Sequence, residues 1–164
     1  EYKDYSDGNY YNLVLSVSGL DKSISISNYL NNFINSDSPQ IEARFRSSLP
    51  GVSDPETPKV VIEAILNETI RGADAPYLLA GLISHHENGK NAWEIIKLNW
   101  EDLLKVMPEW TSSRILDGLP SVYDEHIGKD IQDFIKLNPL PSAEKLTKQK
   151  FERLNANSYL NRYP

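Results

Sequence analysis

Cysteine is absent from the 164-residue sequence. This absence excludes disulfide bonds, thiol nucleophiles, iron–sulfur clusters and cysteine-containing zinc sites, and it fits a reducing compartment such as the cytoplasm. Long apolar runs are missing too, and none approaches the roughly 20 residues that a membrane-spanning helix needs. No apolar leader follows a basic start. The sequence therefore predicts neither a membrane partner nor a signal peptide.

Basic residues are fewer than acidic ones. Seventeen Lys and Arg stand against 23 Asp and Glu, which gives a net charge of −6, whereas a nucleic-acid-binding surface needs a basic field. The densest basic stretch covers residues 145–150, but on a helix Lys145 and Lys148 share a neighbouring face with Glu152. We therefore expect a solvated surface there and no nucleic acid partner.

Methionine is scarce as well, because the sequence begins with Glu1 and its one methionine is Met107. This pattern indicates a segment cut from a longer polypeptide. A chain of this size can still bury about 70% of the surface that it exposes when unfolded, so a real core is expected. Hydrophobic residues make up 40% and charged residues 24%, as in ordinary globular proteins. We expect a single domain over residues 1–164.

Helix start and stop signals are what the sequence has in abundance. Capping residues before a proline open segments at Ser38-Pro39 and at Ser53-Asp54-Pro55, Asp74 and Asp124 are further caps, and Asn88-Gly89 is typical of a left-handed helix end. The sequence predicts helices over residues 24–34, 38–49, 53–70, 74–88, 90–107, 124–137 and 142–163, with one or two helical turns over 111–119.

The first third of the sequence gives weaker signals for secondary structure. Residues 13–17 have strand propensity, but we interpret them as a helix with an exposed start. No pair of strands joined by a hairpin turn is found in the sequence. Together, the helix signals indicate about eight helices with short connections. This pattern predicts an all-α fold of antiparallel helix pairs stacked side by side.

The segment 90–107 has the clearest amphipathic pattern. Trp93, Ile96, Trp100 and Met107 recur on one face, while lysines and glutamates occupy the other. Core packing, rather than a ligand cage, is therefore the expected role of both tryptophans. Trp110 follows this segment, and its burial in the core is less strongly predicted.

His85-His86-Glu87 is the candidate for a metal site. A zinc-hydrolase helix carries H-E-x-x-H, with two imidazoles one turn apart. Here Lys90 stands where the second histidine is needed, and Gly89 is expected to end the helix at that place. The sequence therefore predicts no metal site in this segment, and two exposed histidines at a helix end.

Motifs for catalysis are also missing. The sequence has no glycine-rich phosphate loop, no Gly-x-Ser-x-Gly elbow and no paired Ser and Lys motif, and its carboxylates are scattered, so no catalytic residue is predicted. Arg71 and Asp74 lie at a turn between two apolar helices, where they either tie the turn or project towards a ligand. Two classes of function remain: a helical-repeat interaction module, or a regulatory or substrate-enclosing part of a larger enzyme.

Five stretches carry a recognisable pattern in order. Residues 38–44 are similar to P-Q-E…R, 53–56 lead into an apolar helix, 70–77 are similar to V-R-x-Q-D with Ala73 in place of Gln, 91–100 are similar to A-W-x-F-x-x-x-N-W, and 130–135 are similar to E-V-x-x-F-F. Together they resemble the C-terminal helical domain of the zinc aminopeptidase N superfamily, which includes endoplasmic-reticulum, puromycin-sensitive and archaeal tricorn-interacting aminopeptidases. The resemblance covers residues 28–163 and leaves residues 1–27 unmatched.

This resemblance implies a parent enzyme that removes N-terminal residues from peptides. In the superfamily, zinc held by H-E-x-x-H and a downstream glutamate activates water, and G-x-M-E-N holds the amino terminus of the substrate. These motifs are not in the 164 residues, so the zinc is expected in a missing catalytic domain. The implied fold is a right-handed, HEAT-like array or bowl that covers this catalytic domain.

The implied function is a lid that is not itself catalytic, at the C-terminal end of the parent chain. Its partners would be the catalytic domain of its own chain and the peptide substrate, and the alternative is a free-standing helical-repeat interaction module. Arg71 or Arg114 is expected to face the peptide and to meet a carboxylate through a forked contact. The expected structural residues are Asp74, Trp93, Trp100 and Phe134.

Overall fold

The structure is a computed structural model that describes residues 25–122 and 124–160. Within these ranges it contains nine α-helices, two 3₁₀ helices and no strand, which confirms the all-α prediction. No helix of the described ranges is both long and apolar enough to cross a membrane. The helix predicted over residues 13–17 lies outside the described residues.

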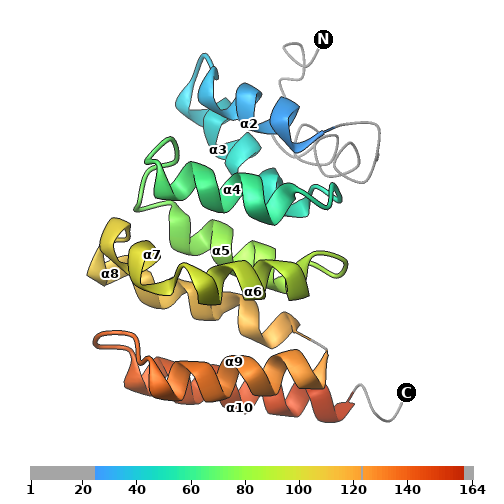
Figure 1. Cartoon of the computed structure of the whole chain (residues 1–164), viewed down its shortest axis with the longest axis vertical. Coiled ribbons are helices and arrows are strands. Elements are labelled where there is room, and N and C mark those ends of the chain that lie inside the picture. The colour runs from blue at the N-terminus through green and yellow to red at the C-terminus, as the bar shows by residue number, and fades with distance from the viewer. Residues whose placement is uncertain (1–24, 123, 161–164) are drawn as a thin grey trace.

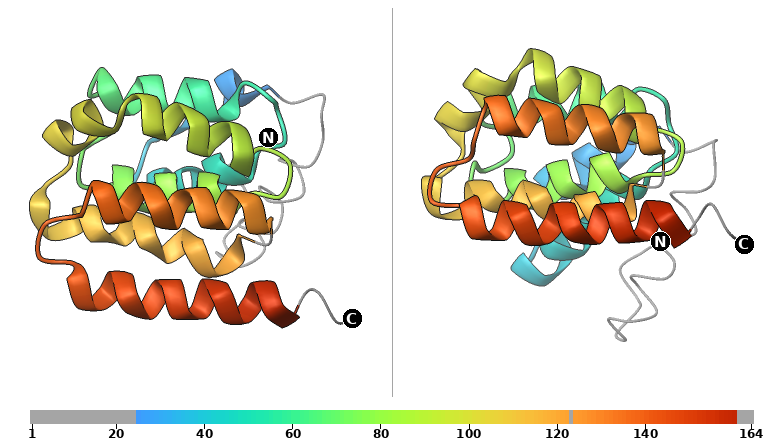
Figure 2. Two further views of the ribbon diagram at one scale, coloured as in Figure 1. Left: turned by 60° about the horizontal axis from the view of Figure 1, so that its bottom comes forward. Right: turned by 90° about the horizontal axis from the view of Figure 1, so that it is seen from below.

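The helices stack in two layers along the long axis of the molecule (Figures 1 and 2). One layer contains α2 (Ile26–Ile34), α4 (Thr57–Leu66), α6 (Gly89–Leu98) and α9 (Glu125–Leu137). The other contains α3 (Pro39–Ser48), α5 (Ala75–Ser84), the 3₁₀ helix η3 (Ser113–Ser121) and α10 (Glu144–Leu160). Shorter pieces connect them: η2 (Leu49–Gly51), α7 (Trp100–Val106) and α8 (Glu109–Ser112).

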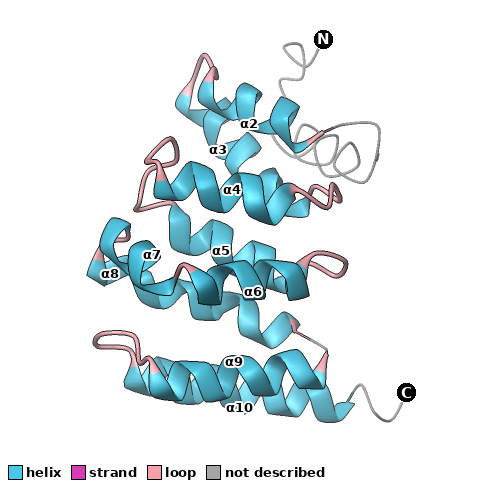
Figure 3. Ribbon diagram, in the orientation of Figure 1, coloured by secondary structure: helices cyan, strands magenta, loops and turns pink. Residues whose placement is uncertain are grey.

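The turns between helices fall on two opposite sides of the stack (Figure 3). Residues 35–38, 67–74 and 138–143 lie on one side, which we call the 67–74 side. Residues 52–56 and 85–88 lie on the other, which we call the 85–88 side. Successive helices therefore run in opposite directions, as the short connections predicted.

The core lies between the two layers and is continuous along the stack. Helix α5 is buried nearly all round, and α4 exposes only the face of Lys59 and Glu63, because each has neighbours in its own layer and in the opposite one. Their apolar residues therefore show no single stripe, and capping rather than periodicity identified them as helices. The largest fully buried side chains are Trp93, Ile26, Leu49, Ile62, Ile65, Ile70, Leu78, Leu79, Leu82, Ile96 and Leu103.

One contact within the core joins two backbones directly. Gly118 of η3 lies against α5, and a Cβ atom built on Gly118 would be 2.2 Å from the carbonyl oxygen of Ala80. Glycine is required here because no side chain fits between the two chains. This contact fixes the spacing of α5 and η3 in the middle of their layer.

Two predicted caps are confirmed. The Ser38 side chain accepts a hydrogen bond from the backbone N–H of Ile41, and the Asp124 side chain accepts from the backbone N–H groups of His126 and Ile127. Both residues satisfy N–H groups at helix starts that have no partner within the helix.

At two other predicted caps, Asp54 and Asp74, tertiary contacts engage the carboxylates. Asp74 lies at the N-cap position of α5, as predicted, whereas the start predicted at residue 53 is wrong. α4 begins at Thr57 rather than at residue 53, and it ends at Leu66 rather than at residue 70. The Oδ1 atom of Asp54 accepts from the backbone N–H of Glu56 at 2.9 Å, and its Oδ2 atom accepts from that of Ile26 at 3.1 Å. The Asp74 side chain makes no cap hydrogen bond with α5.

Three predicted helix boundaries also differ from the structure. α5 ends at Ser84 and Gly89 begins α6, so the predicted left-handed end at Gly89 is wrong. The predicted helix 90–107 breaks at Asn99, whose side-chain amide donates to the carbonyl oxygen of Ile95 at 2.8 Å. α10 begins two residues after Ser142, which has a φ of 55° and does not cap it.

Candidate functional site

A groove of about 840 Å³ lies along α5, between it and the end of α3. Asp74 precedes α5 and His85 follows it, so these two lining residues are about 15 Å apart along a helix of ten residues. The lining mixes a charged pair with hydroxyl groups and imidazoles, and it includes Arg46, Ser47, Asp74, Tyr77, Ser84 and His86. Such a surface can bind a polar, extended ligand.

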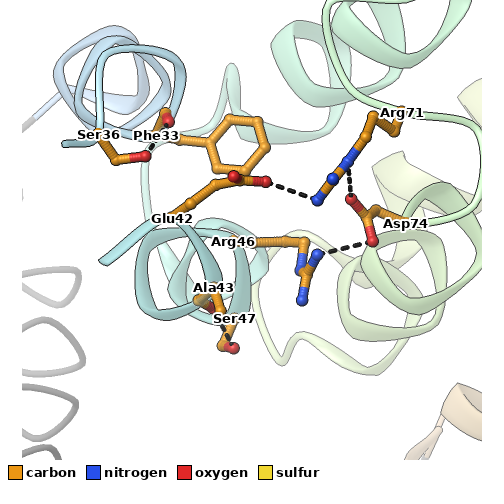
Figure 4. A network of polar contacts seen from close by, with 8 residues as sticks. All are labelled: Phe33, Ser36, Glu42, Ala43, Arg46, Ser47, Arg71 and Asp74. Atoms are coloured by element: carbon orange, nitrogen blue, oxygen red, sulfur yellow. Dashed lines mark hydrogen bonds and ion pairs between the residues drawn. The ribbon is translucent and has the colours of Figure 1, made fainter. Parts of the chain in front are cut away.

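A network of four charged side chains lies at the Asp74 end of this groove (Figure 4). Asp74 accepts from Nη1 of Arg46 at 2.7 Å and from Nε of Arg71 at 3.0 Å. Nη2 of Arg71 also donates to Oε1 of Glu42 at 2.6 Å. The hydrogen bond and charge of Asp74, followed by the charge of Glu42, raise the pKa of Arg71 above its usual value. The network ties α3 to the turn that precedes α5.

The two arginines predicted to face the peptide lie in different places. Arg71 belongs to the network, is not a lining residue of the groove, and has a side chain that is 66% exposed. Arg114 lies on η3 with its Nη1 atom 3.7 Å from Asp117, and its side chain is 53% exposed. Asp117 also binds Nζ of Lys150 at 2.7 Å, so Lys150 is only 15% exposed and is not part of a solvated basic surface.

Arg46 is the groove residue that the sequence interpretation missed. Its side chain is 29% exposed, and it joins the network to the groove. The spacing of Glu42 and Arg46 could have identified it, because residues four apart lie on one face of a helix. Its pairing with Asp74 could not have been found in this way, since the two residues are far apart in the sequence.

The histidine pair lies where α5 ends. Nδ1 of His85 accepts hydrogen bonds from the backbone N–H groups of Glu87 at 3.2 Å and Asn88 at 3.1 Å, which fixes the turn into α6. Within the described residues, no group of three or more His, Asp or Glu side chains is arranged to hold a metal ion. His85 and His86 both line the groove.

The second cluster of sequence-predicted residues lies between α6, α7 and α9. The rings of Trp93 and Trp100 each contact Phe134 edge to face, with ring centroids 5.4 Å apart. Nε1 of Trp93 donates to Oδ2 of Asp130 at 2.6 Å, and Nζ of Lys97 donates to the same oxygen at 2.7 Å. Trp93 is 2% and Trp100 5% exposed, so the cluster is a packing contact and not an open ligand cage.

Stability should depend on pH through Asp130. Hydrogen bonds from Lys97 and then Trp93 lower the pKa of Asp130, which favours its charged form in the folded state. This stabilisation is fully present above the pKa of an unfolded aspartate, about 3.9, and is lost as the pH falls through the lower folded value. We expect Asp130→Asn to destabilise the protein at pH 7 and to cost progressively less below about pH 4.

Urea unfolding of the wild type and of Asp130→Asn, measured between pH 7 and pH 3, tests this expectation. A Lys97→Met background is the control, because it removes the largest contribution to the lowered pKa and should reduce the pH dependence of the difference. A difference between the two proteins that is the same at every pH would contradict it.

Comparisons with known proteins agree on one family. The family model described as ERAP1-like C-terminal domain matches residues 10–156. Aminopeptidase M1-B of Oryza sativa subsp. japonica is 28% identical over 123 residues, and Aminopeptidase M1 of Arabidopsis thaliana is 26% identical over 127 residues. These matches cover 73% and 74% of the chain but only 14% of each relative. No solved structure matches the chain. The family match begins at residue 10, so it includes part of the region that the sequence resemblance left unmatched.

Proposed function

This chain belongs to the ERAP1-like C-terminal domain family, and from that premise we propose that it is the lid domain of a zinc-dependent aminopeptidase. Both relatives are named aminopeptidases, and each extends far beyond the part that the chain covers. The proposal assigns the zinc and the hydrolysis of the peptide bond to the part of the parent that carries H-E-x-x-H. The segment itself supplies no catalytic residue.

The groove along α5 is the observation that supports a role in enclosing the peptide. Its volume, about 840 Å³, lies within the range of about 300–1,000 Å³ that is usual for ligand pockets. Its length of about 15 Å accommodates about four residues of an extended peptide, at roughly 3.5 Å per residue. The lid would therefore hold and orient the peptide, and its closure would exclude water from the reaction.

Arg46 brings a positive charge to this groove. A guanidinium has five N–H donors, and the bond to Asp74 uses one on Nη1. The remaining donors suit a forked contact with the terminal carboxylate of a peptide. Arg71 and Arg114, both more than half exposed, stay in the proposal as further peptide contacts.

Kinetics of the full-length enzyme test the role of Arg46. We expect Arg46→Gln to raise KM about tenfold for peptides with a free C-terminal carboxylate, because a charge-assisted hydrogen bond contributes about 1.5 kcal/mol. Amidated peptides and single aminoacyl amides should be cleaved as before. Lys105→Gln is the control, since Lys105 is 72% exposed and pairs with Asp102 on its own helix.

Three results would contradict the proposal. If Arg46→Gln impaired free and amidated peptides equally, or if Arg71→Gln or Arg114→Gln alone had the effect, Arg46 would not be the carboxylate contact. If the isolated segment released amino acids at a zinc-dependent rate, the chemistry would not lie in another domain.

Three wider expectations belong to the same proposal. Residues 1–164 act as one domain, their helix pairs form a right-handed HEAT-like bowl, and the parent works in the cytoplasm. The two layers with turns on opposite sides support the bowl. The cysteine-free composition supports the cytoplasmic location.

A further inference from the structure

The exposed large hydrophobic side chains lie on one side of the stack. Among the described residues these are Ile34, Tyr77, Leu98, Trp110 and Leu137. Ile34, Leu98 and Leu137 are the last residues of α2, α6 and α9, and all three helices run towards the 67–74 side (Figure 3). Tyr77 lies in the first turn of α5, which starts on that side, and Trp110 lies in α8, also on that side.

The exposure of three of these side chains is nearly complete. Leu98 is 83%, Leu137 82% and Trp110 77% exposed. Their packing therefore contributes little to this stack, and polar residues would serve equally well at these positions if water covered them. A partner that covered these side chains would gain from the removal of their apolar surface from water, and tryptophan is enriched at the centres of interfaces.

The 85–88 side has the opposite chemistry. A cavity of about 590 Å³ on this side is lined by Ser53, Asp54, Glu87, Asn88 and Asn91, among others. No large hydrophobic side chain of the described residues is exposed there. Single exposed apolar residues are normal on any surface. Here the large ones of the described residues all lie on one side, which makes that side the candidate interaction surface.

We propose that the 67–74 side docks against the part of the parent chain that precedes this segment. The inference rests on the proposed function, and it adds the surface through which the lid meets the rest of the enzyme. The matched relatives are about seven times as long as the matched region, since it covers 14% of each. The family is, by its description, a C-terminal domain, so most of such a protein comes before it and is available to cover this side.

The mixed composition of the surface suits this occupant. Interfaces between domains of one chain bury about 600–1,500 Å² and are more polar than the interfaces of permanent complexes. The exposed hydrophobic side chains are separated by exposed charged residues such as Lys105 and Lys136, which matches that polar character. A lid that opens and closes needs an interface of this intermediate kind, because a continuous apolar surface would hold it shut.

Thiol labelling of the full-length protein tests the proposal, and the absence of cysteine from this segment makes each introduced thiol traceable by peptide mass spectrometry. Leu98→Cys is paired with Lys90→Cys at the other end of α6, and Leu137→Cys with His126→Cys at the other end of α9. We expect the Leu98 and Leu137 variants to react about tenfold more slowly than their partners, because a covered thiol reacts less readily than an exposed one.

The outcomes separate this inference from the proposed function. Equal rates within each pair, or slower labelling on the 85–88 side, would overturn the docking surface. Protection that is lost on dilution would identify a second copy of the chain as the occupant, and protection that requires added peptide would identify the substrate; both would overturn it. Protection in a full-length protein that cleaves no peptide would support the surface and reject the aminopeptidase function.

Discussion

Replacement of Gly118 by alanine should lower the free energy of unfolding by about 3 kcal/mol, at the upper end of the usual cost of overpacking. The new Cβ atom would lie 2.2 Å from the carbonyl oxygen of Ala80, and about 3 Å from the Cα and carbonyl carbon of the same residue. All three atoms belong to the backbone of α5, so no side chain can rotate away. The two helices would have to separate.

Urea unfolding of the Gly118→Ala variant measures this loss. Gly51→Ala is a matched control, because a Cβ atom on Gly51 has no neighbour within 4 Å. The control should leave stability within about 0.5 kcal/mol of the wild type. Similar values for the two variants would show that the close contact of α5 and η3 is absent in solution.

Trp93→Ala should have the largest effect of any single substitution considered, a loss of about 4 kcal/mol. The substitution would leave a cavity beside Phe134 and would remove the hydrogen bond that the indole donates to Asp130. Trp93 is 2% exposed, so nearly the whole side chain contributes to the core.

Trp110→Ala provides the comparison, because it removes the same side chain from a position that is 77% exposed. In the isolated segment, the free energy of unfolding of this variant should lie within about 0.5 kcal/mol of the wild-type value. Thermal or urea unfolding of both variants tests the pair. Equal losses of unfolding free energy in the two variants would mean that the face carrying Trp93 and Trp100 does not pack against the core.

Local signals predicted the parts of the fold that local chemistry determines. The capping roles of Ser38 and Asp124 depend on backbone groups two or three residues away, and the stripe of Trp93 and Trp100 depends on the period of one helix. Asp54 and Asp74 resemble caps just as well, but residues about 28 positions away compete for their carboxylates. The helix start predicted from Asp54 is therefore wrong, whereas Asp74 lies at the N-cap position of α5 but makes no capping hydrogen bond.

The contrast between local and tertiary contacts also explains why the sequence did not predict the candidate site. Arg71 and Arg114, the two arginines predicted from the sequence, are exposed. Arg46 lines the groove because α3 packs beside α5. The position of a groove depends on how two helices meet, and no spacing within either helix encodes that. Tyr77 and His85, by contrast, are eight residues apart along α5 and share one face of it, as helix periodicity alone predicts.

The stretches that resemble the aminopeptidase superfamily meet one another in space. Arg71 of one stretch contacts Glu42 of another. Trp93 and Trp100 of a third stretch contact Phe134 of a fourth. These contacts join neighbouring helix pairs. The motifs therefore encode how the pairs stack, which is why they identify a domain without identifying a chemical site.

The contact between Gly118 and Ala80 also limits how the stack can bend. Two backbones in direct contact cannot slide or rotate past each other without a collision, because no flexible side chain lies between them. α5 and η3 are therefore expected to move together as one rigid unit. At other junctions side chains separate the helices, as Trp100 and Phe134 do between α7 and α9, and small rotamer changes there can accommodate a shift.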